Sequence, residues 1–512
     1  MTKTICAMLP CAITPAATGA APVARLLPLA GLGLLAMALA GCAVGPDYAT
    51  PAQFLPTNWG NAPKTNKPLE AKRLARWWTK LGDRRLDAIV ERAVAGNLDV
   101  ASAKARIREA RATRRQAVGA LFPQVDGFGS GTRSRTAAAT SASGGNTTGN
   151  LFQAGFDASF ELDLFGANAR NVEAATFGVD AADEDLRGVL LTLIGDVATN
   201  YVEARGAQAR VALARRTSAS QRETERLTRT RFTAGSASAL DVERAAAQAA
   251  TTEAAVPTLE AAYAQSLHQL GILTGEAPTA LAGILDRGGP IPAARGTPPA
   301  GIPADVLVNR PDVRRAERQL AQSTARIGQA EAALYPSISL TGNIATTALK
   351  TGDLAKNSSI GWSFGPSLSV PIFNGGELRA AVEVAQAQRD QSDAALRLSV
   401  LTALQDVENS LVNLAKERQR AGKLAAATAS FREAARLSRT LYQSGAASFL
   451  DVLDAERSLY SAEDTLLQSR VAVTSNFVSL NKALGGGWDK PVAVDLPRVI
   501  DANTGPHPRA AY

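Results

Sequence analysis

The chain has 512 residues, of which 46% are hydrophobic and only 5% aromatic, and its formal net charge is +8. This length is enough for a large core or for several domains. The sequence has two histidines and three cysteines, and all three cysteines lie within the first 42 residues. The sequence therefore offers too few histidines and cysteines for a zinc site or for Cys–His catalysis, and almost none for a Ser–His–Asp triad. No convergent acid, base or nucleophile set indicates an enzyme, and no basic run with interleaved aromatic residues indicates nucleic-acid binding.

The N-terminus is typical of an exported lipoprotein. After Arg25, an apolar run of ~15 residues is shorter than the about 20 residues that span a bilayer, and it fits a signal peptide. The run ends in Leu39-Ala40-Gly41-Cys42, which resembles the bacterial lipobox. The resemblance implies removal of residues 1–41 and covalent lipid on Cys42 as the only attached group. The alternative is an ordinary signal peptide with a chance cysteine.

The arm and the first repeat follow. Residues 42–83 are predicted to form a lipidated, largely extended N-terminal arm, because their first part is rich in Pro, Asn and Thr. Residues 84–303 are predicted as a first structural repeat. Its helices are expected at 97–120, at 166–233 and, after a turn at Gly235, at 238–273. The long helix, at about 67 residues, would measure roughly 100 Å.

The first repeat also predicts two strands. Residues 152–164 alternate between an apolar face and a polar face, and the polar face carries Asp157, Glu161 and Asp163. We call the polar, solvent-facing side of the strand its wet face. A weaker strand is expected at about 123–131. The alternatives are a soluble sheet and tilted transmembrane strands, and the length and the lipoprotein signal favour the membrane. Four strands cannot close a barrel and open edges are not tolerated in lipid, so we expect the chain to oligomerise.

A second repeat, residues 304–487, copies the first and precedes a polar tail at 488–512. Phe232–Arg244 matches the first part of Tyr442–Arg457 at a spacing of 210 positions, and a shared spacing of this length indicates a duplicated unit. The copy predicts helices at 309–334, 377–444 and 448–484, and strands within 338–344 and 362–372. The short helices would stack alongside the long ones, giving a rod with strands at one end and two Gly turns at the other.

With these features the chain resembles the TolC/OprM class of outer-membrane efflux channels, and within this class the NodT-type lipoproteins. The resemblance rests on an ordered series of motifs that covers nearly all of residues 42–487. These are Gly41-Cys42-Ala-Val-Gly-Pro-Asp-Tyr48, Trp77-Trp78, Leu162-Asp163-Leu164-Phe165-Gly166, Asn309-Arg-Pro-Asp312, Pro371-Ile-Phe-Asn-Gly-Gly376 and the two Gly turns.

The resemblance implies a mainly α protein with a membrane β-barrel: a homotrimer whose subunits give four strands each to one twelve-stranded barrel and long hairpins to a periplasmic α-barrel. It implies location in the outer membrane and docking to a periplasmic adaptor and an inner-membrane pump of the resistance-nodulation-division type. The channel would passively conduct drugs or other small solutes. The alternative is a structural lipoprotein without a pore. The cargo stays open, although the lack of a Met or His cluster favours organic compounds over metals.

In this family the periplasmic tip is closed at rest by side chains just after the second Gly turn. The matching positions are Leu450, Asp451, Asp454 and Arg457. Three of them, at i, i+4 and i+7, share one helix face, and threefold symmetry would make each a ring that blocks and selects ions.

Three of these positions have plainer interpretations. Ser448-x-x-Asp451 and Ser238-x-x-Asp241 are both N-cap patterns, so it stays open whether Asp451 gates or only caps its helix. Asp454 and Arg457 align with Arg244 and Ala247 in the first copy. A requirement for helix formation that both copies share therefore does not explain them. A surface ion pair is their alternative.

The remaining candidates are a latch and a docking surface. Tyr442 matches a family position whose hydroxyl ties neighbouring helices together in the closed tip, with Asp241 as its candidate partner. The basic residue of this latch in some members falls at Ala447 here, which implies a weaker or different latch. Four turn residues are expected to contact the adaptor, and ordinary hairpin geometry is their alternative. They are Gly235, Ser238, Gly445 and Ser448.

Overall fold

A computed structural model describes residues 43–52, 55–61, 74–137, 146–293, 296, 303–305 and 310–495. The signal peptide, Cys42 and the end of the C-terminal tail lie outside these residues. The described helices are η2 (Trp77–Leu81), α3 (Arg84–Gly96), α4 (Leu98–Gly119), α5 (Ala167–Thr233), α6 (Ala239–Leu273), α7 (Ala282–Leu285), α9 (Pro311–Ala332), η4 (Thr351–Asp353), η5 (Asn357–Ser359), α10 (Glu377–Gln443) and α11 (Phe449–Ala483). The strands are β1 (Gln124–Thr136), β2 (Thr147–Leu162), β3 (Ser337–Ala348) and β4 (Ile360–Ser369).

The predicted fold class is confirmed, and the predicted duplication appears in the helix lengths. α5 and α10 each have 67 residues and begin after a left-handed glycine, Gly166 or Gly376. α6 and α11 each have 35 residues, and α4 and α9 each have 22. The first strand was underestimated, because β1 pairs along 13 residues despite its poor apolar alternation.

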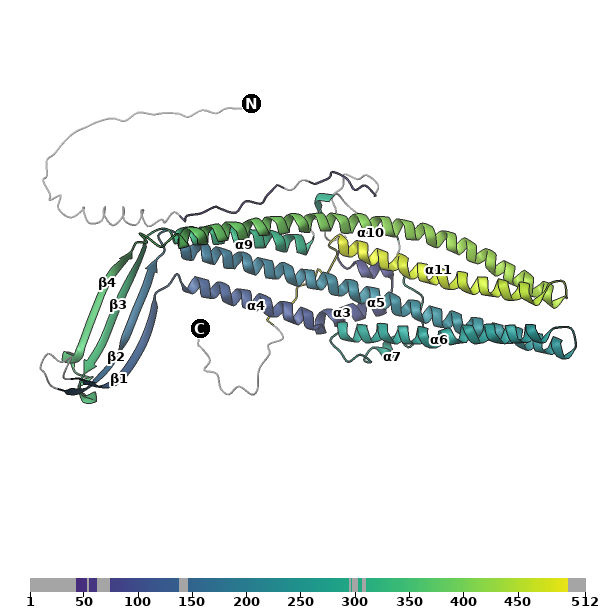
Figure 1. The fold of residues 1–512 in the computed structure, drawn as a ribbon, viewed down its shortest axis with the longest axis horizontal. Coiled ribbons are helices and arrows are strands. Elements are labelled where there is room, and N and C mark those ends of the chain that lie inside the picture. The colour runs from purple at the N-terminus through teal and green to yellow at the C-terminus, as the bar shows by residue number, and fades with distance from the viewer. Residues whose placement is uncertain are drawn as a thin grey trace, which may run out of the picture.

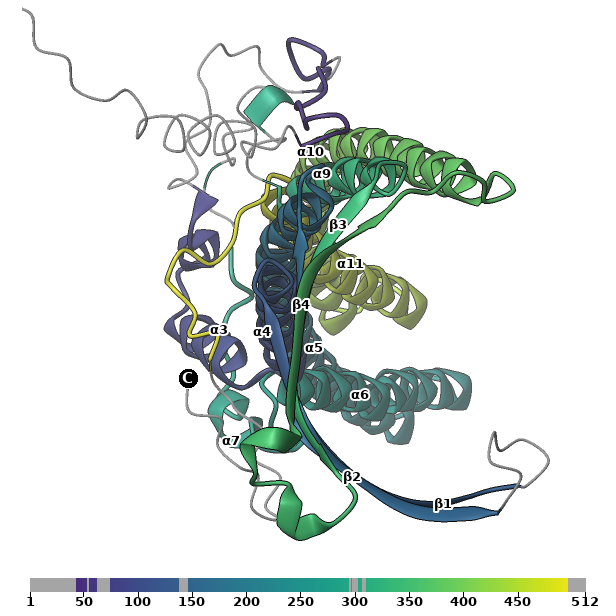
Figure 2. The ribbon, with the colours of Figure 1, turned by 90° about the vertical axis from the view of Figure 1, so that its left-hand side faces the viewer.

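The helices form a long rod that carries the sheet at one end and both hairpin turns at the other, as expected (Figure 1). α4 and α6 follow one another along α5, and α9 and α11 do the same along α10. Viewed from the sheet end, α4, α5, α9 and α10 form a curved layer whose convex side is covered by α3 (Figure 2). The sheet curves in the same sense.

Helix α5 is the centre of the rod, because it also contacts α9 and α11 of the second repeat. Its glycines allow this close approach. A Cβ at Gly206 would lie 2.4 Å from Cγ2 of Val471 in α11, and one at Gly178 would lie 3.0 Å from the amide nitrogen of Gln322 in α9. Glycine costs helix stability, so these residues are explained by packing between the repeats.

The four strands form one antiparallel sheet in the order β1-β2-β3-β4. Asp126 lies opposite Asp157 in the pairing of β1 with β2, and the Asn343 amide donates to Asp157 at 2.5 Å from the other side. Pro366 lies in β4, which is an edge strand within the protomer, as the prolines of this segment predict.

One expectation for the wet strand face was wrong. Asp163 follows the end of β2, and its carboxylate accepts hydrogen bonds from the backbone N–H groups of Asn168 at 3.1 Å and Ala169 at 2.7 Å. The first turn of a helix leaves such donors unpaired, and a carboxylate there also suits the helix dipole. Asp163 therefore caps α5 and contributes no charge to the face of the strand.

A compact region around η2 and α3 packs on the convex side of α5 and contains the largest buried side chains. Trp77 and Trp78 are both 1% exposed. Arg205 of α5 is also 1% exposed, and its guanidinium donates to the Tyr201 hydroxyl at 3.0 and 3.1 Å. That hydroxyl donates to Asp83 at 2.5 Å. Burial raises the pKa of Tyr201, so the hydroxyl stays protonated in this network.

The beginning of the described arm is fixed to the rod by Arg170 of α5. This guanidinium donates to the backbone oxygens of Val44 at 3.1 Å and Gly45 at 3.2 Å, and to the carboxylate of Asp47 at 2.8 Å. Gly45 lies directly against the backbone of Gly328 in α9. The arm therefore joins the two repeats near the sheet.

Candidate functional site

The two hairpin turns at the far end of the rod have the same local geometry. Gly235 and Gly445 both have positive φ, 73° and 79°, which favours glycine. Ser238 and Ser448 then cap α6 and α11, each in a complete capping box with the aspartate three residues on. The sequence of each turn thus specifies a tight reversal followed by a well-defined helix start.

Asp451 has the geometry of a capping residue. Its carboxylate accepts from the Ser448 hydroxyl at 2.8 Å and from the Ser448 backbone N–H at 3.0 Å. These two hydrogen bonds lower the pKa of Asp451, and the bond from the Ser448 hydroxyl has the larger effect. Asp241 accepts the same two bonds from Ser238. The shared geometry favours the capping interpretation of Asp451.

The caps give a first testable prediction. Ser448→Ala should destabilise the start of α11 by about 1 kcal/mol, the usual cost of losing a serine N-cap. Amide hydrogen exchange in the first turn of α11 should become faster, and Ser238→Ala should do the same for α6. Because the folded pKa of Asp451 is lowered, protection by this cap is present above the unfolded value of about 3.9 and is lost as the pH falls through the lower folded value. Unchanged exchange in both variants would contradict the capping role.

The other proposed gate residues lie on an exposed face of α11. Leu450 is 47% exposed, and Asp454 and Arg457 are exposed as well. Among the described residues, no ion pair joins Asp454 or Arg457 to another side chain. The structure therefore places the three side chains of the predicted face together and leaves them free to meet something outside the protomer.

Sequence reasoning missed Glu456, which lies between these residues but faces the interior. Its side chain is 7% exposed and accepts from Arg439 of α10 at 2.5 Å and from Thr224 of α5 at 3.1 Å. The first-copy position of Glu456 holds Ala246. That asymmetry was the available signal, and it identifies a polar contact between the hairpins rather than a pore-facing group.

Tyr442 is buried between the hairpins. Arg231 of α5 stacks over its ring at 4.4 Å and donates to the backbone oxygen of Gln443 at 2.9 Å, while Phe449 packs on its edge. The Tyr442 hydroxyl has no hydrogen-bond partner within the described chain, and Asp241 bonds to its own cap instead. Within one protomer the structure does not bring the two candidate latch residues together.

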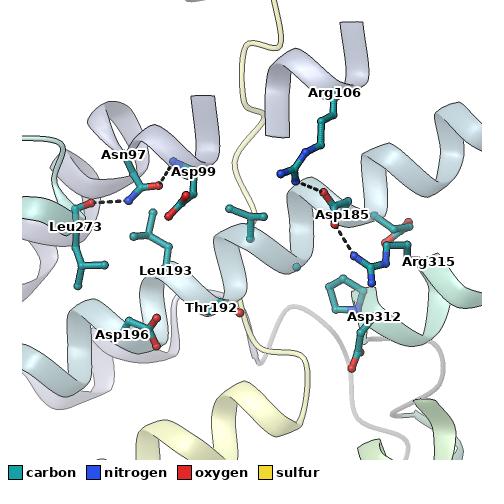
Figure 3. A pocket seen from close by; sticks show the side chains of 14 residues that line it. Asn97, Asp99, Arg106, Asp185, Thr192, Leu193, Asp196, Leu273, Asp312 and Arg315 are labelled. Atoms are coloured by element: carbon teal, nitrogen blue, oxygen red, sulfur yellow. Dashed lines mark hydrogen bonds and ion pairs between the residues drawn. The ribbon is translucent and has the colours of Figure 1, made fainter. Parts of the chain in front are cut away.

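A polar bridge joins the two repeats in the part of α5 that lies nearer the sheet than the hairpin turn. Figure 3 shows Asp185 of α5 between Arg106 of α4 and Arg315 of α9, with N···O distances of 2.9 and 2.6 Å. The neighbouring Glu184 pairs with Arg314 at 2.8 Å, and burial raises its pKa despite this pairing. The contact between α5 and α9 therefore includes ion pairs beside its buried apolar residues.

The described residues offer no group of three or more His, Cys, Asp or Glu side chains that could hold a metal ion. Within the same residues, no helix combines the length and the apolar character needed to cross a membrane.

Comparison with known proteins agrees with this architecture. A family model described as outer membrane efflux protein matches residues 89–276 and 302–486. Nodulation protein T of Rhizobium leguminosarum bv. trifolii is 36% identical over 463 residues, which cover 89% of this chain and 96% of the relative. The toluene efflux pump outer membrane protein TtgI of Pseudomonas putida is 33% identical, with 88% and 96% covered. The solved structure of the outer-membrane channel OprN matches with a TM-score of 0.81 at 34% identity, covering 87% of this chain and all of that one (100%).

A duplicated helical rod that ends in a four-stranded sheet thus defines the class of outer-membrane efflux channels. The chain belongs to the outer membrane efflux protein family. It is the outer-membrane channel component of an efflux system, and its helices extend into the periplasm. The relatives are channel proteins and not enzymes.

Proposed function

We propose that three copies of this chain close one continuous passage, with twelve strands around the membrane section and the long helices around a periplasmic tunnel. The observation that supports this most is the open sheet. Strands β1 and β4 are its two edges, and each lacks a neighbour on one side within the described chain. Unpaired strand edges are not tolerated in lipid, so further copies must pair with them.

Lipid on Cys42 would add an anchor, because two or more acyl chains bind a membrane stably. The passage would receive solutes from a periplasmic adaptor that contacts the hairpin turns around Gly235 and Gly445, and from a resistance-nodulation-division pump in the inner membrane. The exposed, pre-shaped turns support this contact. The pump would supply the energy.

The gate is proposed at Leu450, Asp454 and Arg457, with Asp451 as the cap that fixes the helix on which they stand. Their shared exposed face on α11 supports this assignment. In a trimer each position would occur three times around the axis, and rings of apolar and charged side chains both block a pore and select ions.

The cargo is proposed to be small organic compounds. The relative TtgI is named for toluene efflux, and the described residues hold no metal-binding group. Asp126, Asp157 and Glu161 lie on the wet face of the strands, where they would favour cations.

The test is reconstitution of the purified, full-length protein in planar lipid bilayers, together with its native mass in detergent. We expect a trimer and a cation-selective conductance, and we expect Asp126→Asn with Asp157→Asn to reduce the selectivity. A monomer without conductance would contradict the proposal and favour a structural lipoprotein.

A further inference from the structure

The apolar face of the sheet lies on its convex side. Paired residues share a face, so the pairs Phe156–Ile344 and Ile344–Trp362 place these three side chains together. Thr346 lies on the same face by alternation, and its hydroxyl donates to the backbone oxygen of Leu354 at 2.5 Å. Figure 2 shows the loop between β3 and β4, which contains Leu354, outside the curve of the sheet. We therefore call this apolar face the outer face.

An apolar band covers the outer face over a length that suits a membrane. On β2 the band runs from Leu162 to Phe152, which is about 34 Å along the strand at ~3.4 Å per residue. A tilt of about 40° reduces this length to roughly 26 Å, close to the apolar band of about 25 Å on outer-membrane barrels. Trp362 and Phe364 of β4 belong to the band and are 77% and 69% exposed. The band therefore ends at the level of Phe152.

Three basic side chains lie directly beyond this end of the band. Phe152 pairs with Gly131 of β1, and Arg133 and Arg135 are the next two residues on the same face. Strand β3 ends opposite Phe152, and Lys350 follows two residues later. All three basic residues are exposed. Within the part of the chain that the structure describes, their side chains form no hydrogen bond or ion pair.

The charges of the sheet are divided by face and by end. The acidic residues Asp126, Asp157 and Glu161 lie on the wet face, in the half that adjoins the helices. Residues 136–150, which join β1 to β2, include no acidic residue. The four segments that join the strands to the helices contain no basic residue. They are residues 119–123, 163–166, 333–336 and 370–376. The unpaired basic residues therefore belong only to the end that points away from the helices.

The loop between β3 and β4 is held in place and leaves one basic residue unpaired. The Ser359 hydroxyl donates to the backbone oxygen of Asp353 at 2.8 Å, beside the bond from Thr346 to Leu354. The carboxylate of Asp353 pairs with Lys356 at 2.7 Å. Asp353 is the only acidic residue between positions 344 and 372. Its pairing therefore neutralises Lys356 and leaves the loop with a net positive charge.

This distribution matches the outer leaflet of an outer membrane. Because the helices extend into the periplasm, the opposite end of the sheet lies at the outer leaflet, where lipopolysaccharide exposes the phosphate groups of its lipid A. Long basic side chains reach from the edge of an apolar band to the headgroups. Arginine binds phosphate through two parallel hydrogen bonds. Each basic residue near an anionic membrane surface adds roughly fivefold to the binding.

We propose that Arg133, Arg135 and Lys350 bind the phosphate groups of lipid A and so fix the far end of the sheet in the outer leaflet. The inference rests on the membrane placement of the strands under the proposed function, and it adds the class of lipid that the outer face meets. The opposite end of the apolar band lacks basic residues in its joining segments, so the same recognition is not expected in the inner leaflet.

The test is lipid binding by the purified, full-length protein in detergent, measured by native mass spectrometry. The probes are lipid A, dephosphorylated lipid A and phosphatidylglycerol. We expect the wild-type protein to bind lipid A at least about tenfold more tightly than either of the other two lipids. The variant with Arg133→Gln, Arg135→Gln and Lys350→Gln should lose this preference. Its helical content should stay unchanged, because all three side chains are exposed.

A matched control removes the same charge elsewhere. Arg216→Gln, Arg222→Gln and Arg229→Gln change three exposed ion pairs on α5 near its hairpin turn and should leave lipid A binding unchanged. The variant with Arg133→Lys and Arg135→Lys keeps the charge and should keep most of the binding. Triple-variant binding within about twofold of the wild type would overturn the inference, as would equal binding of lipid A and phosphatidylglycerol by the wild-type protein. A wild-type protein that does not insert into bilayers would overturn the membrane placement as well.

Discussion

Replacing Arg205 with methionine is expected to destabilise the protein by about 3–5 kcal/mol, the usual cost of removing one partner from a buried charged network. Arg205 is 1% exposed, and besides Tyr201 it donates to the Gln208 side chain at 2.7 Å and to the backbone oxygen of Arg287 at 3.0 Å. Methionine would fill much of the volume but leave these acceptors buried without a donor. The apparent melting temperature should fall markedly.

A matched control lies on the same helix. Arg216 is 70% exposed on its side chain and pairs with Glu463 at 3.3 Å. Arg216→Met should therefore cost at most about 1 kcal/mol, as is usual for surface ion pairs. Arg205→Lys should be intermediate, because lysine keeps the charge but cannot reproduce the planar fork. Equal melting temperatures for Arg205→Met and Arg216→Met would show that the buried network does not stabilise the rod.

Replacing Asp454 and Arg457 together with alanine is expected to raise the resting conductance of the reconstituted channel at least about tenfold, or about 1.4 kcal/mol in the balance between closed and open states. Both side chains are exposed on α11 and unpaired within the described chain, so their loss should leave the protomer intact. The change should appear in single-channel recordings, together with altered ion selectivity.

Two further variants separate the gate from its supports. Asp451→Ala removes a cap and should change the conductance far less than the double variant does. Glu456→Ala removes the buried acceptor that joins Arg439 to Thr224, and should loosen the tip without changing ion selectivity. A double variant with wild-type conductance and selectivity, beside a leaky Asp451→Ala, would reverse these assignments.

Most of the fold could be predicted because the relevant signals are local. The proline-free stretch before Gly235 predicts a long helix, and the strict alternation around Phe156 predicts a strand. Strand β1 was underestimated because both of its faces are polar or glycine-rich, and its length is decided by pairing with β2. Asp163 was misplaced for a similar reason: alternation continues past the end of β2, whereas the unpaired donors of α5 decide where the carboxylate binds.

The site was predictable only where it depends on local geometry. The capping boxes at Ser238 and Ser448 follow from residue spacing. The roles of Glu456 and Arg231 depend on which helices become neighbours, and no local pattern contains that information. Duplication gave one useful non-local signal, since a residue found in only one copy serves something that the two copies do not share.

The docked arm changes what a lipid on the chain would do. An N-terminal segment from residue 43 to residue 73 that made no contact with the rod could extend over roughly 100 Å. Lipid at its start would then be only a flexible tether. Arg170 holds the backbone of Val44, and Ala43 packs against Gly166 at the start of α5. Because Cys42 directly precedes Ala43, its lipid would be a rigidly attached anchor close to the junction of the sheet and the helices. Three such lipid anchors around a trimer would fix how deeply the protein sits in the membrane and would oppose tilting of the rod.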